Sequence, residues 1–319
     1  MKTETKQFKA EIGRMLDLVV NSLYSKKEIF LRELLSNASD AIDRAKYLGL
    51  VDKELLSDSP DWKISVSADK DKKLLSISDN GYGMDADDLE NNLGTIASSG
   101  TKKFMEAAAA KDGNNLPELI GKFGVGFYAA FMVADKVTVV SKKRGEDEAF
   151  AWESDGIGSY TVSSAERDSY GTTITLHLRD GQDEYLDEWR IRDLVKSYSD
   201  FIAYPIFFEA LGKKEEENKD EAKKEPEAPK PLNTMTALWK RPKKDVKKEE
   251  YDEFYKHLTH DFDGPLEVIP FSGEGQVELA KSYAKILDKT KGATILVPAI
   301  SGFVKLFHKS NFKPIFLFK

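Results

Sequence analysis

The sequence predicts an α+β fold, a two-layer sandwich in which helices pack on one face of a single β-sheet. Three observations support this. A long segment of helical periodicity comes first, several segments of alternating polarity follow, and helices are mixed with these segments without strict β-α-β alternation. The 319 residues, 40% of them hydrophobic, suffice for one large domain and part of a second.

The first helix is expected over residues 22–50, where apolar residues recur at helical spacing, as at Leu31, Leu34, Leu35 and Ile42. Strands are expected where polarity alternates, over 63–67, 74–79, 136–141, 150–153, 159–162 and 172–178. Shorter helices are expected over 87–93, 127–133 and 183–202.

A charged segment over residues 213–230, with two prolines near its end, contains no large apolar residue. Such a composition favours a flexible linker, because it buries too little surface to offset the entropy of ordering. We therefore predict a first domain over 1–212, a linker over 213–231 and a second segment over 232–319. In the second segment a helix is expected over 247–260 and a strand over 271–279.

Composition excludes several classes of function. The net charge of −7 argues against binding to nucleic acid or to an anionic membrane surface. The absence of cysteine excludes disulfides and thiolate chemistry. No apolar run approaches the ~20 residues that span a bilayer, and residues 1–6 lack the apolar core of a signal peptide. We expect a cytoplasmic protein with no membrane or nucleic-acid partner.

Glu33, Asn37, Asp40 and Arg44 share one face of the first predicted helix. One interpretation is a solvated polar face. The other is functional, since a glutamate can activate a water and an asparagine can hold Mg²⁺, which prefers oxygen ligands. Small neighbours such as Ala38 and Ser39 would let a ligand approach.

Two glycine-rich segments follow. Asp79 ends a predicted strand and starts the pattern DxGxG. One interpretation of this pattern is an ordinary turn with two glycines. The other is a binding site in which the Asp79 carboxylate accepts a hydrogen bond from an exocyclic amine such as that of adenine. Gly121, Gly124 and Gly126 form GxxGxG before a helix, either as a tight turn or as a phosphate-binding loop. The latter pattern is neither a Rossmann fingerprint nor a P-loop. His257 and His260 lack a third metal ligand at helical spacing.

A helix that carries Glu and Asn is followed by DxGxG and then by GxxGxG. This order of motifs is similar to that of the gyrase, chaperone, histidine-kinase and MutL ATPase superfamily, whose ATP-binding domain has the Bergerat-type fold. Five segments further resemble the ninety-kilodalton heat-shock chaperone family, with the bacterial HtpG type nearest. They are 22–41 (SLYSKKEIFLRELLSNASDA), 78–84 (SDNGYGM), 93–101 (LGTIASSGT), 120–128 (IGKFGVGFY) and 251–262 (YDEFYKHLTHDF). The resemblance covers about residues 5 to 278.

The resemblance implies an ATP-dependent molecular chaperone that binds ATP or ADP with Mg²⁺, hydrolyses ATP weakly and acts on unfolded client proteins. It implies that Glu33 is the general base, that Asn37 coordinates Mg²⁺ and that Asp79 recognises the adenine amine. It also implies a lid over about 93–121 that closes over the nucleotide. The nucleotide-contacting positions implied are Asn37, Asp40, Ala41, Asp79, Gly83, Met84, Asn92, Leu93, Ser99, Gly100, Gly121, Phe123, Gly124, Val125, Gly126, Phe127 and Thr172.

Two departures from the family pattern carry expectations of their own. Ser98 stands where family members often carry a phosphate-contacting lysine, so Lys102 or Lys122 would have to substitute. After residue 278 the match is expected to stop, leaving 279–319 as a divergent, poorly folded end of a truncated middle-domain fragment with an apolar tail. The family is homodimeric, and its dimerisation domain and middle-domain arginine have no counterpart here. The alternative function is therefore nucleotide binding without productive hydrolysis. A histidine-kinase or gyrase-like ATPase is the third reading, disfavoured by the acidic charge balance.

Overall fold

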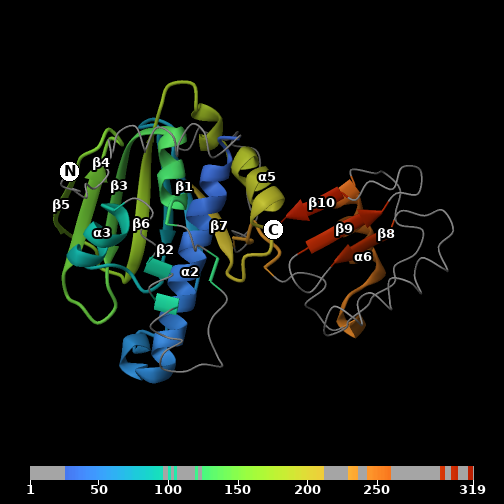
Figure 1. Ribbon diagram of the computed structural model, residues 1–319, viewed down its shortest axis with the longest axis horizontal. Coiled ribbons are helices and arrows are strands. Elements are labelled where there is room, and N and C mark those ends of the chain that lie inside the picture. Colours follow the sequence, from blue (N-terminus) through green and yellow to red (C-terminus); the bar gives the residue numbers. More distant parts are fainter. Residues whose placement is uncertain are drawn as a thin grey trace, which may run out of the picture. The chain divides into compact units, whose positions relative to one another are not determined.

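The computed structural model describes residues 26–95, 100–101, 104–105, 119–120, 124–211, 229–235, 243–259, 295–298, 303–307 and 315–318. It divides the chain into two compact units, Met1–Met235 and Thr236–Lys319. Figure 1 shows the mixed α+β first unit, which contains the candidate site, and we describe each unit by itself.

A seven-stranded sheet of order β5-β4-β3-β6-β2-β1-β7 forms the first unit. Its strands are β1 (Ile64–Asp69), β2 (Leu74–Asp79), β3 (Ala134–Lys142), β4 (Ala149–Ser154), β5 (Tyr160–Ala165), β6 (Gly171–Leu178) and β7 (Ile206–Leu211). Neighbouring strands are antiparallel except β1 and β7, which run parallel. The predicted α+β sandwich is confirmed, and six of these strands lie within a few residues of their predicted ranges.

Helix α2 (Ile29–Val51) lies against the sheet, and α5 (Glu188–Tyr198) packs beside it (Figure 1). Most of the apolar positions that predicted α2 are buried, including Leu34, Leu35 and Ile42 at 0% exposure. The helix ends where Asp52 adopts an extended backbone and its carboxylate accepts a 3.0 Å hydrogen bond from the Glu54 amide. That bond caps the short 3₁₀ helix η1 (Lys53–Leu56).

Strand β2 shows how alternation places the site. Leu75, Ile77 and Asp79 are buried, whereas Ser76 and Ser78 on the opposite face are half-buried. The two serine hydroxyls meet threonine hydroxyls of β6, Thr175 at 3.0 Å and Thr173 at 2.8 Å. Asp79 therefore occupies a core-facing position, the place that a strand normally gives to an apolar side chain.

The remaining helices of the first unit are short. Helix α3 (Ala86–Leu93) matches its predicted range, and the 3₁₀ helix η2 (Gly126–Met132) lies one residue from the helix expected over 127–133. The single helix expected over 183–202 is instead η3 (Asp183–Leu186) followed by α5, because Asp187 between them is extended.

Strand β7 was not predicted, and it lies directly before the charged segment. The Leu232 amide donates a 2.7 Å hydrogen bond to the Ile206 carbonyl, and the buried Asn233 side chain accepts a 2.9 Å bond from the Ile206 amide. Residues 232–235 thus pack on the first unit, although the predicted second segment began at 232. The charged segment thus begins directly after β7, and the residues that follow the segment hydrogen-bond to the same strand.

The second unit contains η5 (Lys243–Asp245), α6 (Lys248–Thr259) and a three-stranded antiparallel sheet of order β10-β9-β8. Its strands are β8 (Ile295–Pro298), β9 (Phe303–Phe307) and β10 (Ile315–Phe318). The helix expected over 247–260 is confirmed, and the strand expected over 271–279 lies outside the described residues. These three strands lie within residues 279–319, and the expectation of a poorly folded end there stays a prediction. None of the helices in the described ranges has the length and apolar composition that crossing a bilayer requires.

Candidate functional site

Asp79 is the buried carboxylate at the centre of the candidate site. It is 8% exposed, ends β2 and pairs in register with Thr172 of β6. One carboxylate oxygen, Oδ1, accepts a 2.8 Å hydrogen bond from the Gly81 amide. That bond turns the chain directly after the strand.

The electrostatic surroundings of Asp79 raise its pKa to about 6. Burial is the largest cause, since it disfavours the charged form. The Gly81 amide, the Arg167 guanidinium, the Thr172 amide and the Arg144 guanidinium oppose it. At neutral pH the carboxylate is thus ionised but poorly solvated, which suits it to accept hydrogen bonds from a neutral amine.

Two glycines let the turn after Asp79 touch its neighbours. A Cβ on Gly81 would lie 2.5 Å from the Ala41 carbonyl carbon, and the Tyr82 amide donates a 3.0 Å hydrogen bond to the Ala41 carbonyl. Gly83 has φ +73°, and a Cβ there would collide with the Lys142 carbonyl. The turn therefore contacts the backbone of α2 on one side and of β3 on the other, and only glycine permits either approach.

Ser141 of β3 connects two predicted site residues that are distant in sequence, Met84 and Thr172. Its fully buried hydroxyl accepts a 2.9 Å hydrogen bond from the Met84 amide and lies 2.8 Å from the Thr172 hydroxyl. It also donates to the Gly171 carbonyl at 3.2 Å. Sequence reasoning missed Ser141, because a serine in an alternating strand carries no signal of its burial.

A second group of predicted residues lies nearer the start of α2. Glu33 is half-buried and forms an ion pair with Arg32 through Oε1, and its other oxygen, Oε2, lies against Gly126 at the start of η2. Asn37 is half-buried on the same helix. The buried Asp40 carboxylate accepts a 2.8 Å hydrogen bond from the Ile120 amide. The helix face is thus largely packed, which favours the functional interpretation over a solvated surface.

Helix α2 sets the distance between the residues around Asp79 and those around Glu33. Eight residues separate Glu33 from Ala41, which contacts the Asp79 turn, and eight residues correspond to about 12 Å along an α-helix. A ligand lying along α2 would therefore meet a hydrogen-bonding carboxylate at one end and Glu33 with a glycine-rich turn at the other. That is the arrangement expected for a molecule with a base at one end and phosphates at the other.

Aromatic packing positions the remaining predicted residues. Phe127 is 7% exposed and meets Trp152 edge-to-face, with ring centroids 5.4 Å apart. The Tyr128 hydroxyl donates a 2.7 Å hydrogen bond to the Leu93 carbonyl, at the end of α3. Asn92 lies against Gly100, and Gly124 takes φ +66° before Val125. Ser99, Gly121 and Phe123 lie outside the described residues, as do Ser98, Lys102, Lys122 and most of the expected lid.

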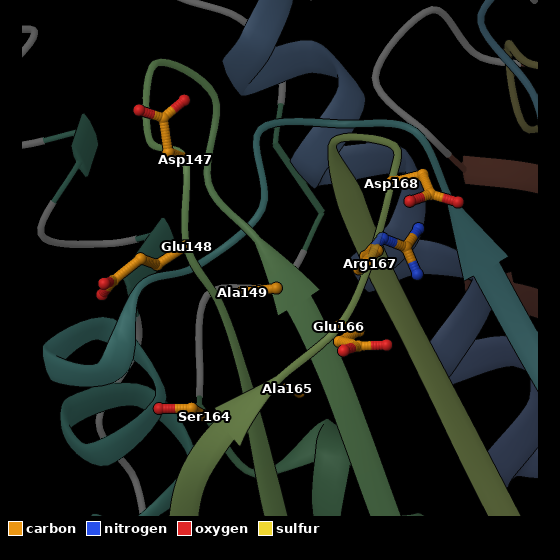
Figure 2. Close-up of a pocket in the computed structure, with 8 residues that line it drawn as sticks. All are labelled: Asp147, Glu148, Ala149, Ser164, Ala165, Glu166, Arg167 and Asp168. Carbon is orange, nitrogen blue, oxygen red and sulfur yellow. The ribbon is translucent and has the colours of Figure 1, made fainter.

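An open hollow of about 340 Å³ lies elsewhere, between the chain before β4 and the chain after β5. Asp147 and Glu148 lie on one side of it, and Glu166, Arg167 and Asp168 on the other (Figure 2). No predicted residue lines the hollow. Arg167, which lines the hollow, donates a 3.3 Å hydrogen bond to the Asp79 carbonyl of the candidate site.

Comparison with known families agrees with this geometry. Residues 24–177 match the model described as histidine kinase-, DNA gyrase B- and HSP90-like ATPase. Residues 184–231 and 210–283 match the Hsp90 protein model. The chaperone protein HtpG of Geobacter metallireducens is 46% identical over 286 residues, covering 87% of this chain and 44% of that protein. The chain belongs to the Hsp90 family, in its HtpG branch.

Two further HtpG relatives extend the comparison. The Myxococcus xanthus protein is 48% identical over 276 residues, 86% of this chain and 42% of the relative. The Rickettsia massiliae protein is 45% identical over 314 residues, 98% of this chain and 48% of the relative. A match of that length includes residues beyond 278, so the expectation that the resemblance stops there is wrong. The chain spans less than half the length of these Hsp90 relatives.

Proposed function

We propose that the first unit binds ATP or ADP with Mg²⁺ and hydrolyses ATP slowly, as part of an ATP-dependent chaperone that acts on unfolded proteins in the cytoplasm. The observation that carries the proposal is the buried Asp79 carboxylate, one oxygen of which is fixed by the Gly81 amide. An adenine amine would donate to the other oxygen. Membership of the Hsp90 family and the ATPase domain match support the same assignment.

Glu33 is proposed as the general base. Its Oε1 is held by Arg32, so Oε2, which lies beside Gly126, is the oxygen that would accept a proton from the attacking water. Such positioned proton transfer contributes typically 10²–10⁴-fold to rate. Arg32 keeps Glu33 oriented, because the guanidinium and carboxylate form a charge-assisted pair.

The residues fit a Mg²⁺ ion held mainly by nucleotide phosphates and water. Within the described residues no group of three or more histidine or acidic side chains could hold a metal alone. The half-buried Asn37 amide oxygen is the proposed protein ligand, in keeping with the few protein ligands that Mg²⁺ usually takes at phosphate sites. Bound there, the ion would neutralise phosphate charge.

Closure of residues 93–121 over the nucleotide is proposed to drive the conformational change that acts on clients. The alternative, nucleotide binding without productive turnover, is kept because it predicts a different result in one assay. Steady-state ATP turnover by this chain above that of Glu33→Ala supports hydrolysis. Equal rates support binding alone.

Titration calorimetry with ADP·Mg²⁺ tests the pocket. We expect saturable binding that Asp79→Asn weakens at least about tenfold, the effect of losing one charge-assisted hydrogen bond. Glu33→Ala should keep ADP binding and lose turnover, whereas Glu54→Ala, an exposed glutamate on η1, should change neither. Absence of ADP binding by a folded chain would overturn the proposal.

A further inference from the structure

Consecutive carbonyl oxygens in the turn after β2 all accept hydrogen bonds from two arginines. The Asp79 carbonyl accepts from Arg167 Nη2 at 3.3 Å, the Asn80 carbonyl from Arg144 Nη2 at 2.9 Å and the Gly81 carbonyl from Arg144 Nε at 3.0 Å. The Tyr82 carbonyl accepts from the Arg144 backbone amide at 2.8 Å. The carbonyl groups of the turn are therefore fixed one after another.

Arg144 is itself rigidly held. Its side chain is 1% exposed, and Nη1 donates to the Leu55 carbonyl at 3.0 Å and to the Asp58 carboxylate at 2.8 Å. Its guanidinium lies 5.0 Å from the Trp62 ring centroid and 5.2 Å from that of Tyr170. A buried guanidinium with this many partners has one available conformation, so it can hold the turn in one place.

Fixing the carbonyls also fixes the amides between them, because each peptide unit is planar. The Gly81 amide then points at Asp79 Oδ1 and the Tyr82 amide at the Ala41 carbonyl. These two bonds set the direction of the Asp79 carboxylate and its distance from α2. The chain of contacts thus runs from Arg144 through the turn to the carboxylate.

We propose that Arg144, assisted by Arg167, is a positioning residue for base recognition, which aims the Asp79 carboxylate at the exocyclic amine of an adenine nucleotide. The inference rests on the proposed function. It predicts that loss of Arg144 removes the preference for the amine rather than nucleotide binding as a whole. A purely structural arginine would instead weaken all nucleotides in the same proportion.

Calorimetric titrations of the full chain with ADP·Mg²⁺ and with inosine diphosphate·Mg²⁺ separate these outcomes. Inosine diphosphate has the same ribose and phosphates but an oxygen in place of the amine. We expect the native chain to prefer ADP at least about tenfold. In Arg144→Met the preference should fall to less than about threefold, with inosine diphosphate affinity nearly unchanged.

Arg179→Met is the matched control. Arg179 also follows a strand and donates through Nε to a backbone carbonyl, that of Ala134 at 3.0 Å, but it caps the opposite end of β6. This variant should lose stability and keep the native preference. Arg144→Met with an unchanged ADP preference, or with equal loss for both nucleotides, would overturn the inference.

A milder variant covers the case in which Arg144→Met does not fold. Asp58→Asn leaves Arg144 in place and removes its anionic partner, whose side chain is 40% exposed. We expect a smaller fall in the ADP preference and an unchanged affinity for inosine diphosphate. A folded Asp58→Asn chain with the full native preference would count against positioning. Failure of the proposed function would give a different result from failure of this inference. In that case the native chain would bind no nucleotide, or it would bind ADP and inosine diphosphate with equal affinity.

The pH dependence of ADP binding gives a second readout. The charged groups that act on Asp79 are Arg167 from the loop after β5 and Arg144 from the end of β3, and both favour its ionised form. Loss of Arg144 should therefore move the midpoint of ADP binding to higher pH. The Arg179→Met midpoint should stay at the native value.

Discussion

The Tyr204 hydroxyl donates a 2.5 Å hydrogen bond to the Asp43 carboxylate, which joins the chain before β7 to helix α2. Burial raises the pKa of Asp43, while this hydrogen bond and the nearby Lys46 lower it. Burial raises the pKa of Tyr204, and the contact with Asp43 raises it further. The bond therefore ties the last strand of the sheet to the helix that carries the candidate site.

Tyr204→Phe should lower the free energy of unfolding by about 1.5–3 kcal/mol, the typical contribution of a hydrogen bond to a charged group. The half-buried Asp43 carboxylate would lose its donor, so its pKa should rise further. Urea unfolding at neutral pH measures the first effect. Tyr198→Phe is the control, because within the described residues the Tyr198 hydroxyl has no hydrogen-bond partner, and a loss of equal size there would contradict the assignment.

The pH dependence of ADP binding follows from Asp79. Its pKa of about 6 means that the carboxylate is ionised above pH 6 and protonated below it, and only the ionised form accepts from the amine with full strength. ADP affinity relative to inosine diphosphate should be constant above about pH 7 and should fall toward equal affinity as the pH drops through 6. The ratio cancels the titration of the phosphates. A ratio that stays constant down to pH 5 would exclude this role for Asp79.

Asp79→Asn should stabilise the protein that has no nucleotide bound. Because the folded pKa of about 6 lies above the ordinary 3.8, the folded state holds this proton more tightly than the unfolded state. The favourable contribution of this bound proton to the free energy of unfolding is complete below about pH 4 and is lost as the pH rises through 6. At pH 7 the difference corresponds to about 3 kcal/mol.

The asparagine keeps an oxygen for the Gly81 amide and carries no charge, so most of that free energy should be regained. Unfolding curves at pH 4 and pH 7 check this, with a larger gain at pH 7. Asp69→Asn serves as the comparison, since Asp69 is also 8% exposed at a strand end and accepts a backbone hydrogen bond, from the Lys72 amide. An Asp79→Asn chain less stable than the native chain at pH 7 would show that the carboxylate contributes to the fold.

Gly83→Ala should destabilise the first unit and weaken ADP binding together. The residue has φ +73°, and the new Cβ would collide with the Lys142 backbone, so either the turn or β3 must move. We expect a loss of at least about 3 kcal/mol in the free energy of unfolding. Gly181→Ala is matched in conformation, with φ +79°, but its Cβ would meet nothing within 4 Å.

The Gly181→Ala control should therefore lose only the cost of a left-handed backbone, about 1–2 kcal/mol, and keep ADP affinity. Thermal or urea unfolding with parallel ADP titrations measures both variants. Similar losses in the two would mean that backbone conformation, rather than the contact with β3, accounts for the effect at Gly83.

The sequence predicted those strands and helices in which buried and exposed residues alternate regularly. It did not predict elements that lack such a pattern. Alternation located β2, because Leu75 and Ile77 face the core while Ser76 and Ser78 do not. Strand β7 was missed because its second half, Glu209 to Leu211, is exposed and runs into the charged segment. A strand at the edge of a sheet has only part of the pattern that burial imposes.

The site divides in the same way. Asp79, Gly81 and Gly83 belong to a motif, so their positions could be predicted together. Arg144 could not be predicted, since in the sequence Lys142-Lys143-Arg144 nothing distinguishes it from the two lysines beside it. Only the structure shows that its side chain is 1% exposed. Burial of an arginine depends on partners distant in sequence, here Leu55 and Asp58, which no local pattern reveals.

The contacts of β7 have a consequence for the charged segment that follows it. The chain leaves this strand after Leu211 and is bonded to it again at Leu232, whose amide meets the Ile206 carbonyl. Leu211 and Leu232 are therefore both held by the first unit, and the length of the segment between them affects that unit through loop-closure entropy. Doubling that length would cost only about 0.6 kcal/mol in closure entropy. The first compact unit accordingly continues past the charged segment to Met235.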